Sequence, residues 1–375
     1  MNNSDCINVL IAEDSAYQRQ LISEMLLSHK DIENIEIARN GREVFEKIEQ
    51  YNPDVLILDL LMPEIDGLTV FKVLSEHYPI PTIIFSSLNP ETLQPSVQTL
   101  LMGAFDFISK PQGLWKEEFP KYKDKLISSV LYAAKIKKNY EKRNNLIKKS
   151  IESSSRLEIP LKTKYSCPKS IHPSKPPHFD LESNIIVMGT STGGPRTIKF
   201  ILKSIPDDLP CPILIVQHLD PFFMTQLAES LDNACVINVL IPRNGEEIQP
   251  GIAYLSPGGK HMKIIKRNNK SYIKIFEGEP VNFCIPSVDV LFFSAAEVYK
   301  NQTLGILLTG LGNDGAAGLE AIKLKGGETI AESEETSVVY GMPKAAAERG
   351  AAKKILPNYK IKDYMIKFAR KFTNN

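Results

Sequence analysis

Short runs of apolar residues, separated by amphipathic stretches, recur through both halves of this 375-residue chain. Each run is apolar at successive positions, as expected of a strand that is buried on both faces. Such strands, alternating with helices, are typical of parallel sheets that helices cover on both sides. We therefore expect two α/β domains, with strands at residues 7–12, 35–38, 55–60, 82–85 and 105–108 in the first and 185–188, 213–216 and 304–308 in the second.

The net charge of +1 conceals two segments of opposite charge. Residues 1–128 carry 11 basic and 20 acidic side chains, whereas residues 135–175 carry 12 basic and three acidic ones. Five prolines and three consecutive serines lie within residues 145–182, a composition that does not build a core. We expect a domain over 1–128, a helical end and basic linker over 129–182, and a second domain over 183–375.

Several classes of protein are disfavoured by composition. The hydrophobic content of 43% and the charged content of 24% are those of a globular protein. The chain starts without a basic region followed by an apolar one, and no apolar stretch approaches the ~18 residues of a membrane span. We therefore expect a cytoplasmic protein that does not insert into a membrane. The basic linker lacks any helix-turn-helix, zinc-finger or RNP pattern, so we expect no nucleic-acid partner.

The five cysteines never occur as C-x-x-C, which argues against a disulfide framework and against a zinc ribbon. We expect each to be a small buried hydrophobic residue. They are Cys6, Cys167, Cys211, Cys235 and Cys284.

Polar residues end four of the five apolar runs in the first half. They are Glu13, Asp14, Asp59, Ser86 and Lys110. The carboxyl ends of parallel strands share one edge of a sheet, where open α/β folds bind ligands. Three carboxylates there would repel one another, and Mg²⁺ with oxygen ligands is the simplest remedy. The lysine and the hydroxyl would then bind phosphoryl oxygens, with Asp59 as nucleophile. Any one of these acids is equally a common helix N-cap, and we expect Asp66 in a turn rather than as a ligand.

The second half carries a serine in a G-x-S-x-G frame directly after an apolar run. Glycines permit the tight turn that would expose the Ser191 hydroxyl. A glycine-rich turn can instead cradle a phosphate, but the spacing here fits neither dinucleotide-binding nor P-loop motifs. Of six histidines, His218 is the one that ends a strand, and Asp314 follows another. Parallel strands would bring these three residues to one edge, with Asp314 orienting His218 and the backbone N–H of Thr192 stabilising an oxyanion.

Two resemblances follow from these motifs. The spacing of Asp59 and its neighbours resembles the receiver domain of two-component response regulators across residues 7–128. The segments G-T-S-T-G-G-P, I-V-Q-H-L and L-T-G-L-G-N-D-G-A-A-G resemble the catalytic domain of chemotaxis protein-glutamate methylesterases, the CheB family, over residues 183–370. The order Ser, His, Asp fits neither α/β-hydrolases nor chymotrypsin-like proteases. The resemblance implies a flavodoxin-like receiver with a five-stranded parallel sheet, followed by a doubly wound α/β catalytic domain.

The receiver resemblance assigns roles to the first set of residues. It implies that Mg²⁺ is needed for phosphorylation and that a chemotaxis histidine kinase phosphorylates Asp59. Phe107 falls at the aromatic switch position, although an ordinary core aromatic is an alternative. In this resemblance the metal is held by Glu13, Asp14 and Asp59, and Ser86 and Lys110 contact the phosphoryl group.

The catalytic resemblance implies a phosphorylation-activated carboxylic ester hydrolase. Its substrates would be glutamate methyl esters on the cytoplasmic helices of chemoreceptors, and it would also deamidate receptor glutamines, with no cofactor for the esterase chemistry. The unphosphorylated receiver is expected to pack over the catalytic edge. Leu311 stands where the family commonly has Met near the oxyanion site, and the linker is longer and more basic than expected. Two alternatives remain: a response regulator with a DNA-binding output, and a non-catalytic adaptor, which Leu311 alone hints at.

Overall fold

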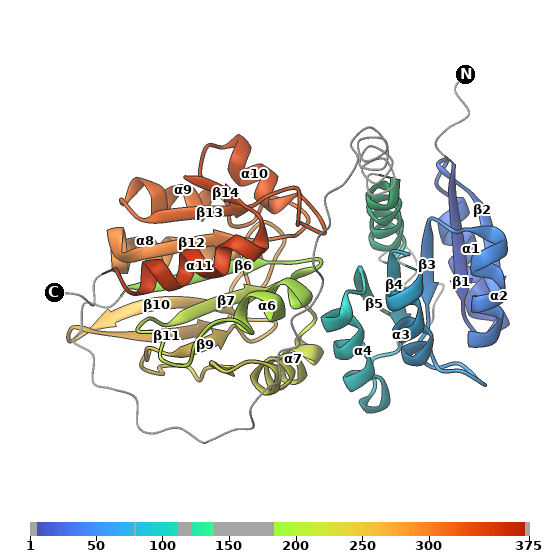
Figure 1. Ribbon diagram of the computed structural model, residues 1–375, viewed down its shortest axis with the longest axis horizontal. Helices are drawn as coiled ribbons and strands as arrows, with labels where there is room; N and C mark the ends of the chain where they lie inside the picture. The colour runs from blue at the N-terminus through green and yellow to red at the C-terminus, as the bar shows by residue number, and fades with distance from the viewer. Residues whose placement is uncertain (1–5, 79, 112–121, 139–183, 372–375) are drawn as a thin grey trace, which may run out of the picture.

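The computed structural model describes residues 6–78, 80–111, 122–138 and 184–371. These residues form two α/β domains that lie side by side (Figure 1), the N-terminal domain over 6–138 and the C-terminal domain over 184–371. The linker that we expect at residues 145–182, together with Cys167, lies outside the described residues. The boundaries assigned from composition therefore stay predictions.

The N-terminal domain is a parallel sheet of five strands in the order β2-β1-β3-β4-β5, one of the two common doubly wound orders. The strands are β1 (Ile7–Ala12), β2 (Ile32–Ala38), β3 (Val55–Leu58), β4 (Thr82–Ser86) and β5 (Asp106–Ser109). The helices are α1 (Ala16–Leu27), α2 (Gly41–Tyr51), α3 (Gly67–His77), α4 (Pro90–Met102) and a helix over residues 122–138. All four residues of β3 are buried, as the uninterrupted apolar pattern predicts.

One local expectation in this domain is wrong. Asp66 does not lie in an isolated turn: it is the N-cap of α3, and its side chain accepts a hydrogen bond of 2.8 Å from the backbone N–H of Thr69. Gly67 is the first residue of that helix, and a Cβ there would meet the backbone oxygen of Asp59 at 2.0 Å. The dipeptide therefore starts a helix that packs closely beneath the end of β3.

The C-terminal domain contains a seven-stranded parallel sheet in the order β14-β13-β12-β6-β7-β9-β8, with a separate antiparallel hairpin, β10-β11. The strands are β6 (Ile185–Thr190), β7 (Ile213–Gln217), β8 (Asn238–Leu240), β9 (Ile252–Leu255), β10 (His261–Arg267), β11 (Lys270–Phe276), β12 (Thr303–Leu307), β13 (Glu328–Glu332) and β14 (Lys354–Leu356). The helices are α6 (Gly194–Leu202), α7 (Pro221–Ala234), α8 (Val288–Tyr299), η1 (Lys300–Gln302), α9 (Ala316–Leu324), α10 (Met342–Glu348) and α11 (Asn358–Ala369). The three predicted strands β6, β7 and β12 are neighbours at the centre of the sheet.

Helix α4 of the N-terminal domain packs against α6 and α7 of the C-terminal domain (Figure 1). Phe107 on β5 and Phe223 on α7 form the aromatic contact of this interface, with ring centroids 4.5 Å apart and ring planes at 70°. Val339 of the C-terminal domain belongs to an apolar cluster of N-terminal-domain residues, and Leu311 and Val338 pack against this cluster. The two domains therefore share a continuous apolar interface.

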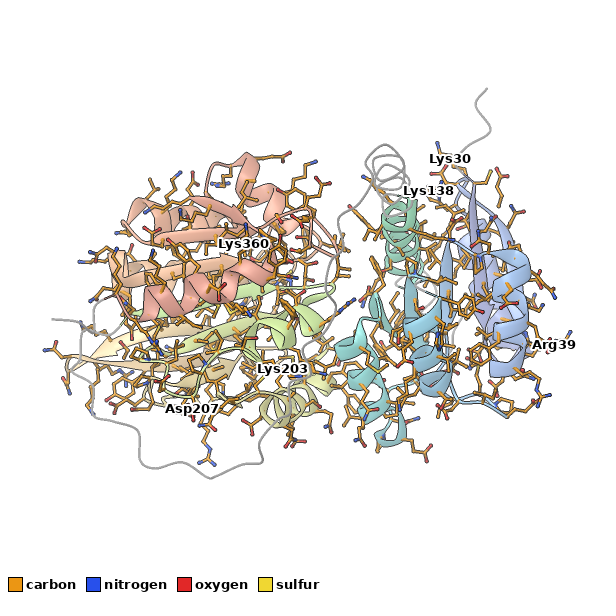
Figure 2. The ribbon with its side chains drawn as sticks, viewed as in Figure 1. Lys30, Arg39, Lys138, Lys203, Asp207 and Lys360 are labelled. Carbon is orange, nitrogen blue, oxygen red and sulfur yellow. The ribbon has the colours of Figure 1, made fainter. Side chains whose placement is uncertain are left out.

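The outer faces of both domains are charged, as Arg39 and Lys360 illustrate in Figure 2. Across the described segments, no helix combines the length and the apolar character that a membrane span needs. The expectation that every cysteine is buried is wrong: Cys211 is buried, but Cys6 is exposed and Cys235 and Cys284 are partly exposed. Cys284 lies beside the candidate active site.

Candidate functional site

The first candidate site lies at the carboxyl edge of the N-terminal sheet. Lys110, directly after β5, places its Nζ 2.6 Å from Oδ2 of Asp59 and 2.7 Å from Oε2 of Glu13. The Ser86 hydroxyl, at the end of β4, donates a 2.6 Å hydrogen bond to Oδ1 of Asp59. All four side chains are buried. The predicted strand-end residues thus meet around the carboxylate of Asp59.

Three carboxylates of this site are close enough to share a cation. Ligand oxygens of Glu13, Asp14 and Asp59 all lie within 4.8 Å of one another. Burial raises the pKa of Glu13 to about 7; Lys110 opposes this shift and Asp59 adds to it. A divalent cation would offset the cost of holding these charges together, and three carboxylate oxygens suit Mg²⁺. The donor set therefore fits the cation that the sequence predicts.

The second candidate site begins at Ser191, the residue that follows β6. Its backbone N–H donates to the carbonyl oxygen of Thr309 at 3.0 Å, and its own carbonyl accepts from the N–H of Gly194 at 2.8 Å. Helix α6 starts at Gly194, where a Cβ would lie 2.0 Å from Oε1 of Gln217. The sequence folds here into a strand, a tight turn and a helix, and Gly193 in the turn has a φ of 78°, a conformation that favours glycine.

His218 follows β7, the neighbour of β6, and hydrogen-bonds with Asp314. The distance from His218 Nε2 to Asp314 Oδ2 is 2.9 Å, which leaves Nδ1 as the nitrogen able to exchange a proton with a substrate or nucleophile. Among the described residues, no hydrogen bond joins His218 to the Ser191 hydroxyl, although both line the same pocket. Catalytic hydrogen bonds are often long or misaligned until substrate binds.

Asp314 is buried at the N-terminus of α8 and accepts four further hydrogen bonds. The N–H groups of Val288 and Asp289 donate at 2.7 and 3.2 Å, Ser287 Oγ at 2.8 Å and Asn282 Nδ2 at 3.1 Å. Burial by itself would raise the pKa of Asp314, but its bond with His218 and these donors hold it below its ordinary value. Asp314 is therefore a fixed anion beside the imidazole.

The same contacts act on His218. Burial alone would lower the pKa of His218, but the hydrogen bond with Asp314 and the contact with Cys284 raise it to about 9. Cys284 Sγ lies 3.7 Å from Nδ1. The protonated imidazole is consequently favoured at neutral pH, and His218 would become able to accept a proton only as the pH approaches 9.

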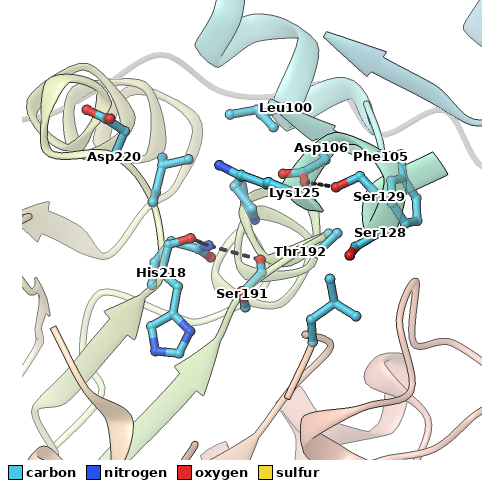
Figure 3. A pocket seen from close by; sticks show the side chains of 15 residues that line it. Leu100, Phe105, Asp106, Lys125, Ser128, Ser129, Ser191, Thr192, His218 and Asp220 are labelled. Atoms are coloured by element: carbon cyan, nitrogen blue, oxygen red, sulfur yellow. Dashed lines mark hydrogen bonds between the residues drawn. The ribbon is translucent and has the colours of Figure 1, made fainter. Parts of the chain in front are cut away.

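A cavity of about 320 Å³ lies where the two domains meet, and Ser191 and His218 line it. Figure 3 shows Asp106, Lys125 and Ser129 of the N-terminal domain facing Ser191 and Thr192. Ser129 Oγ donates a 2.8 Å hydrogen bond to Oδ2 of the half-buried Asp106. The N-terminal domain therefore forms one wall of the pocket that contains the serine.

Thr192 and Leu311 also line this pocket. In the part of the chain that the structure describes, the backbone N–H of Thr192 donates to no protein acceptor. By contrast, the N–H of Ser191 is already bonded to Thr309, so Thr192 is the better oxyanion donor. The Leu311 side chain has no hydrogen-bond donor and packs against the apolar cluster that contains Val339 and N-terminal-domain residues.

Sequence reasoning overlooked two features of the site. Gln217 Nε2 donates to the carbonyl oxygens of Ser191 and His218, at 2.9 Å each, and so holds together the two segments that carry these residues. A turn over residues 281–284 contacts Asp314 and His218. The sequence could have indicated Gln217, because a glutamine directly before a strand-end histidine interrupts an apolar run. The turn over residues 281–284 does not follow a strand end and so leaves no comparable pattern.

Comparison with known proteins gives consistent results for both domains. A family model described as CheB methylesterase matches residues 186–365, and one described as response regulator receiver domain matches residues 9–116. The chain is similar to the protein-glutamate methylesterase/protein-glutamine glutaminase of Archaeoglobus fulgidus, with 38% identity over 362 residues, 96% of this chain and 98% of the relative. The Thermotoga maritima protein of the same name is 35% identical over 360 residues, again 96% of this chain and 98% of the relative. The crystal structure of the T. maritima CheB methylesterase catalytic domain is 40% identical, with a TM-score of 0.49, and covers 49% of this chain and 98% of its own.

Proposed function

Because the chain belongs to the CheB family of protein-glutamate methylesterases, we propose that it is a phosphorylation-activated serine esterase acting on glutamate methyl esters of chemoreceptors. The names of its relatives extend the proposal to deamidation of receptor glutamines, because ester and amide hydrolysis pass through similar tetrahedral intermediates. The observation that carries the proposal is the hydrogen bond between His218 and the buried Asp314, together with the pocket that His218 and Ser191 both line.

The reaction starts with attack of the Ser191 hydroxyl oxygen on the ester carbonyl. His218 accepts the hydroxyl proton at Nδ1 and returns it to the departing methoxide, which leaves as methanol. Water then attacks the acyl-enzyme by the same route in reverse and releases glutamate. Asp314 holds Nε2 protonated and stabilises the imidazolium ion that forms in both steps.

Stabilisation of the oxyanion falls to the backbone of the serine turn. The N–H of Thr192 has no acceptor within the described segments, and Thr192 lines the pocket beside Ser191, which supports its role as donor. A donor placed in advance is worth about 10²- to 10³-fold in rate. Because this donor is a backbone group, Leu311 in place of Met does not remove it.

The receiver domain controls access to this pocket. Asp59 would accept the phosphoryl group from a histidine kinase, with Lys110 and Ser86 binding its oxygens. Glu13, Asp14 and Asp59 would hold Mg²⁺, which neutralises charge on the phosphoryl group during transfer.

Rearrangement of Ser86 towards that group would disturb its register neighbour on β5, the strand that carries Phe107. Phe107 packs directly on Phe223 of the catalytic domain, which supports its assignment as the aromatic switch. Phosphorylation would then shift the population towards a state with the pocket open.

One variant, compared with the wild-type protein, tests the catalytic half of the proposal. Ser191→Ala should abolish both methanol release from methylated chemoreceptor membranes and deamidation of receptor glutamines, with phosphorylation of Asp59 retained. Full hydrolysis by this variant would refute the assignment. A wild-type protein that is phosphorylated but releases no methanol would instead support the adaptor alternative. A DNA-binding output is disfavoured, because the described residues after 184 form the α/β domain that matches the esterase family.

A further inference from the structure

A tight turn over residues 281–284 joins the hairpin β10-β11 to helix α8. Val281 and Cys284 exchange two backbone hydrogen bonds, of 3.2 and 3.0 Å. The two residues between them, Asn282 and Phe283, have φ values of 52° and 62°. Asparagine is often found in this left-handed region, but a bulky aromatic residue there is an outlier.

The turn is attached to the catalytic machinery on both sides. Asn282 Nδ2 donates to Oδ1 of Asp314 at 3.1 Å and to Oδ2 of Asp289 at 2.7 Å. Cys284 Sγ lies 3.7 Å from Nδ1 of His218. The backbone of the intervening residue is therefore held by contacts of its two neighbours with Asp314 and His218.

That residue, Phe283, has a relative exposure of 102%, the highest of the large hydrophobic side chains that the structure describes as exposed. The next highest value in that set is the 80% of Leu324. The receiver domain forms one wall of the pocket that contains Ser191 and His218, but it does not cover the Phe283 ring. Because the ring is fully hydrated, it contributes no free energy of apolar burial to the free protein. Residues with a strained backbone conformation cluster at sites where ligands are held.

We propose that Phe283 is a substrate-contacting residue, which packs against an apolar side chain of the chemoreceptor helix beside the methylated glutamate. The inference rests on the proposed function, because it takes the substrate to be a helix. On a helix, side chains three or four residues apart lie next to each other on one face. A ring carried on a turn beside the catalytic histidine would thus reach a residue one turn from the ester, and so select helical receptor segments over small esters.

The variant Phe283→Asn tests this role, because asparagine suits a positive φ and preserves the turn. We expect kcat/KM for methanol release from methylated receptor membranes to fall about tenfold, mainly through KM, which equals about 1.4 kcal/mol. Hydrolysis of p-nitrophenyl acetate should be unchanged, and Phe283→Tyr should retain receptor activity. Stimulation by a phosphodonor should keep its wild-type ratio, since the ring is exposed while the receiver is docked.

Leu324→Asn is the matched control, because it removes another highly exposed apolar side chain, at the C-terminal end of α9. It should leave activity on both substrates unchanged. Wild-type kcat/KM on receptors for Phe283→Asn would overturn the proposal, as would an equal loss on both substrates, which indicates a structural role. A wild-type dimer that Phe283→Asn dissociates, seen by sedimentation with receptor kinetics unchanged, would assign the ring to self-association. Failure of the proposed function is distinguishable, because wild-type protein would then release no methanol.

Discussion

The contact between Phe107 and Phe223 should set the basal activity of the enzyme. The two rings meet edge to face at 4.5 Å, a geometry worth about 0.5–1.5 kcal/mol beyond the area that it buries. Phe223→Leu keeps an apolar side chain of similar volume in α7 but removes this contact. The open state is the one in which the receiver no longer closes the pocket. If this state is rare, losing about 0.5–1.5 kcal/mol of contact energy raises its population roughly 2- to 13-fold, because 1.4 kcal/mol corresponds to a factor of ten.

The assay is the rate of methanol release from methylated receptor membranes without a phosphodonor. We expect Phe223→Leu to raise this basal rate about 2- to 13-fold and to leave the rate of the phosphorylated enzyme unchanged. Phe292→Leu is the control, since Phe292 is fully buried on α8 in the core of the catalytic domain. If Phe223→Leu does not raise the basal rate while a phosphodonor still stimulates the enzyme, the contact between Phe107 and Phe223 does not hold the pocket closed.

Three further predictions concern the catalytic domain. Because the pKa of His218 is raised to about 9, hydrolysis of p-nitrophenyl acetate should increase with pH until about 9. Cys284→Ser should move the midpoint of the pH–rate profile to lower pH, because the contact with Cys284 contributes to the raised pKa. An unmoved midpoint would contradict the contribution of the thiol to the pKa of His218. Asp314→Asn should lower kcat about 10³- to 10⁴-fold without loss of cooperative unfolding, checked by kinetics and circular dichroism. Gly194→Ala should destabilise the domain by about 1–3 kcal/mol in urea unfolding, because the new Cβ would lie 2.0 Å from Gln217 Oε1; wild-type stability would show that the turn can relax.

The central strands of both sheets could be predicted because burial on both faces leaves an uninterrupted apolar run. The hairpin β10-β11 could not, since one of its faces is open and its lysines, such as Lys263 and Lys274, break the run. The edge strands β8 and β14 have only three residues each and are partly exposed, so they leave almost no pattern.

The candidate site was predictable wherever a functional side chain ends a parallel strand, as Asp59, Ser191 and His218 do. The roles assigned to these residues stay predictions until variants are measured. The turn that carries Phe283 was not predictable, because its importance comes from side-chain contacts with Asp314 and from a left-handed backbone. Neither property has a periodic signal in the sequence.

The most direct test of the central claim is methanol release from methylated chemoreceptor membranes, measured with and without a small phosphodonor plus Mg²⁺. Wild-type protein should show stimulated release, Asp59→Asn should show only the basal rate, and Ser191→Ala should show none. Stimulation that persists in Asp59→Asn, or release that persists in Ser191→Ala, would contradict a serine esterase controlled by phosphorylation of Asp59.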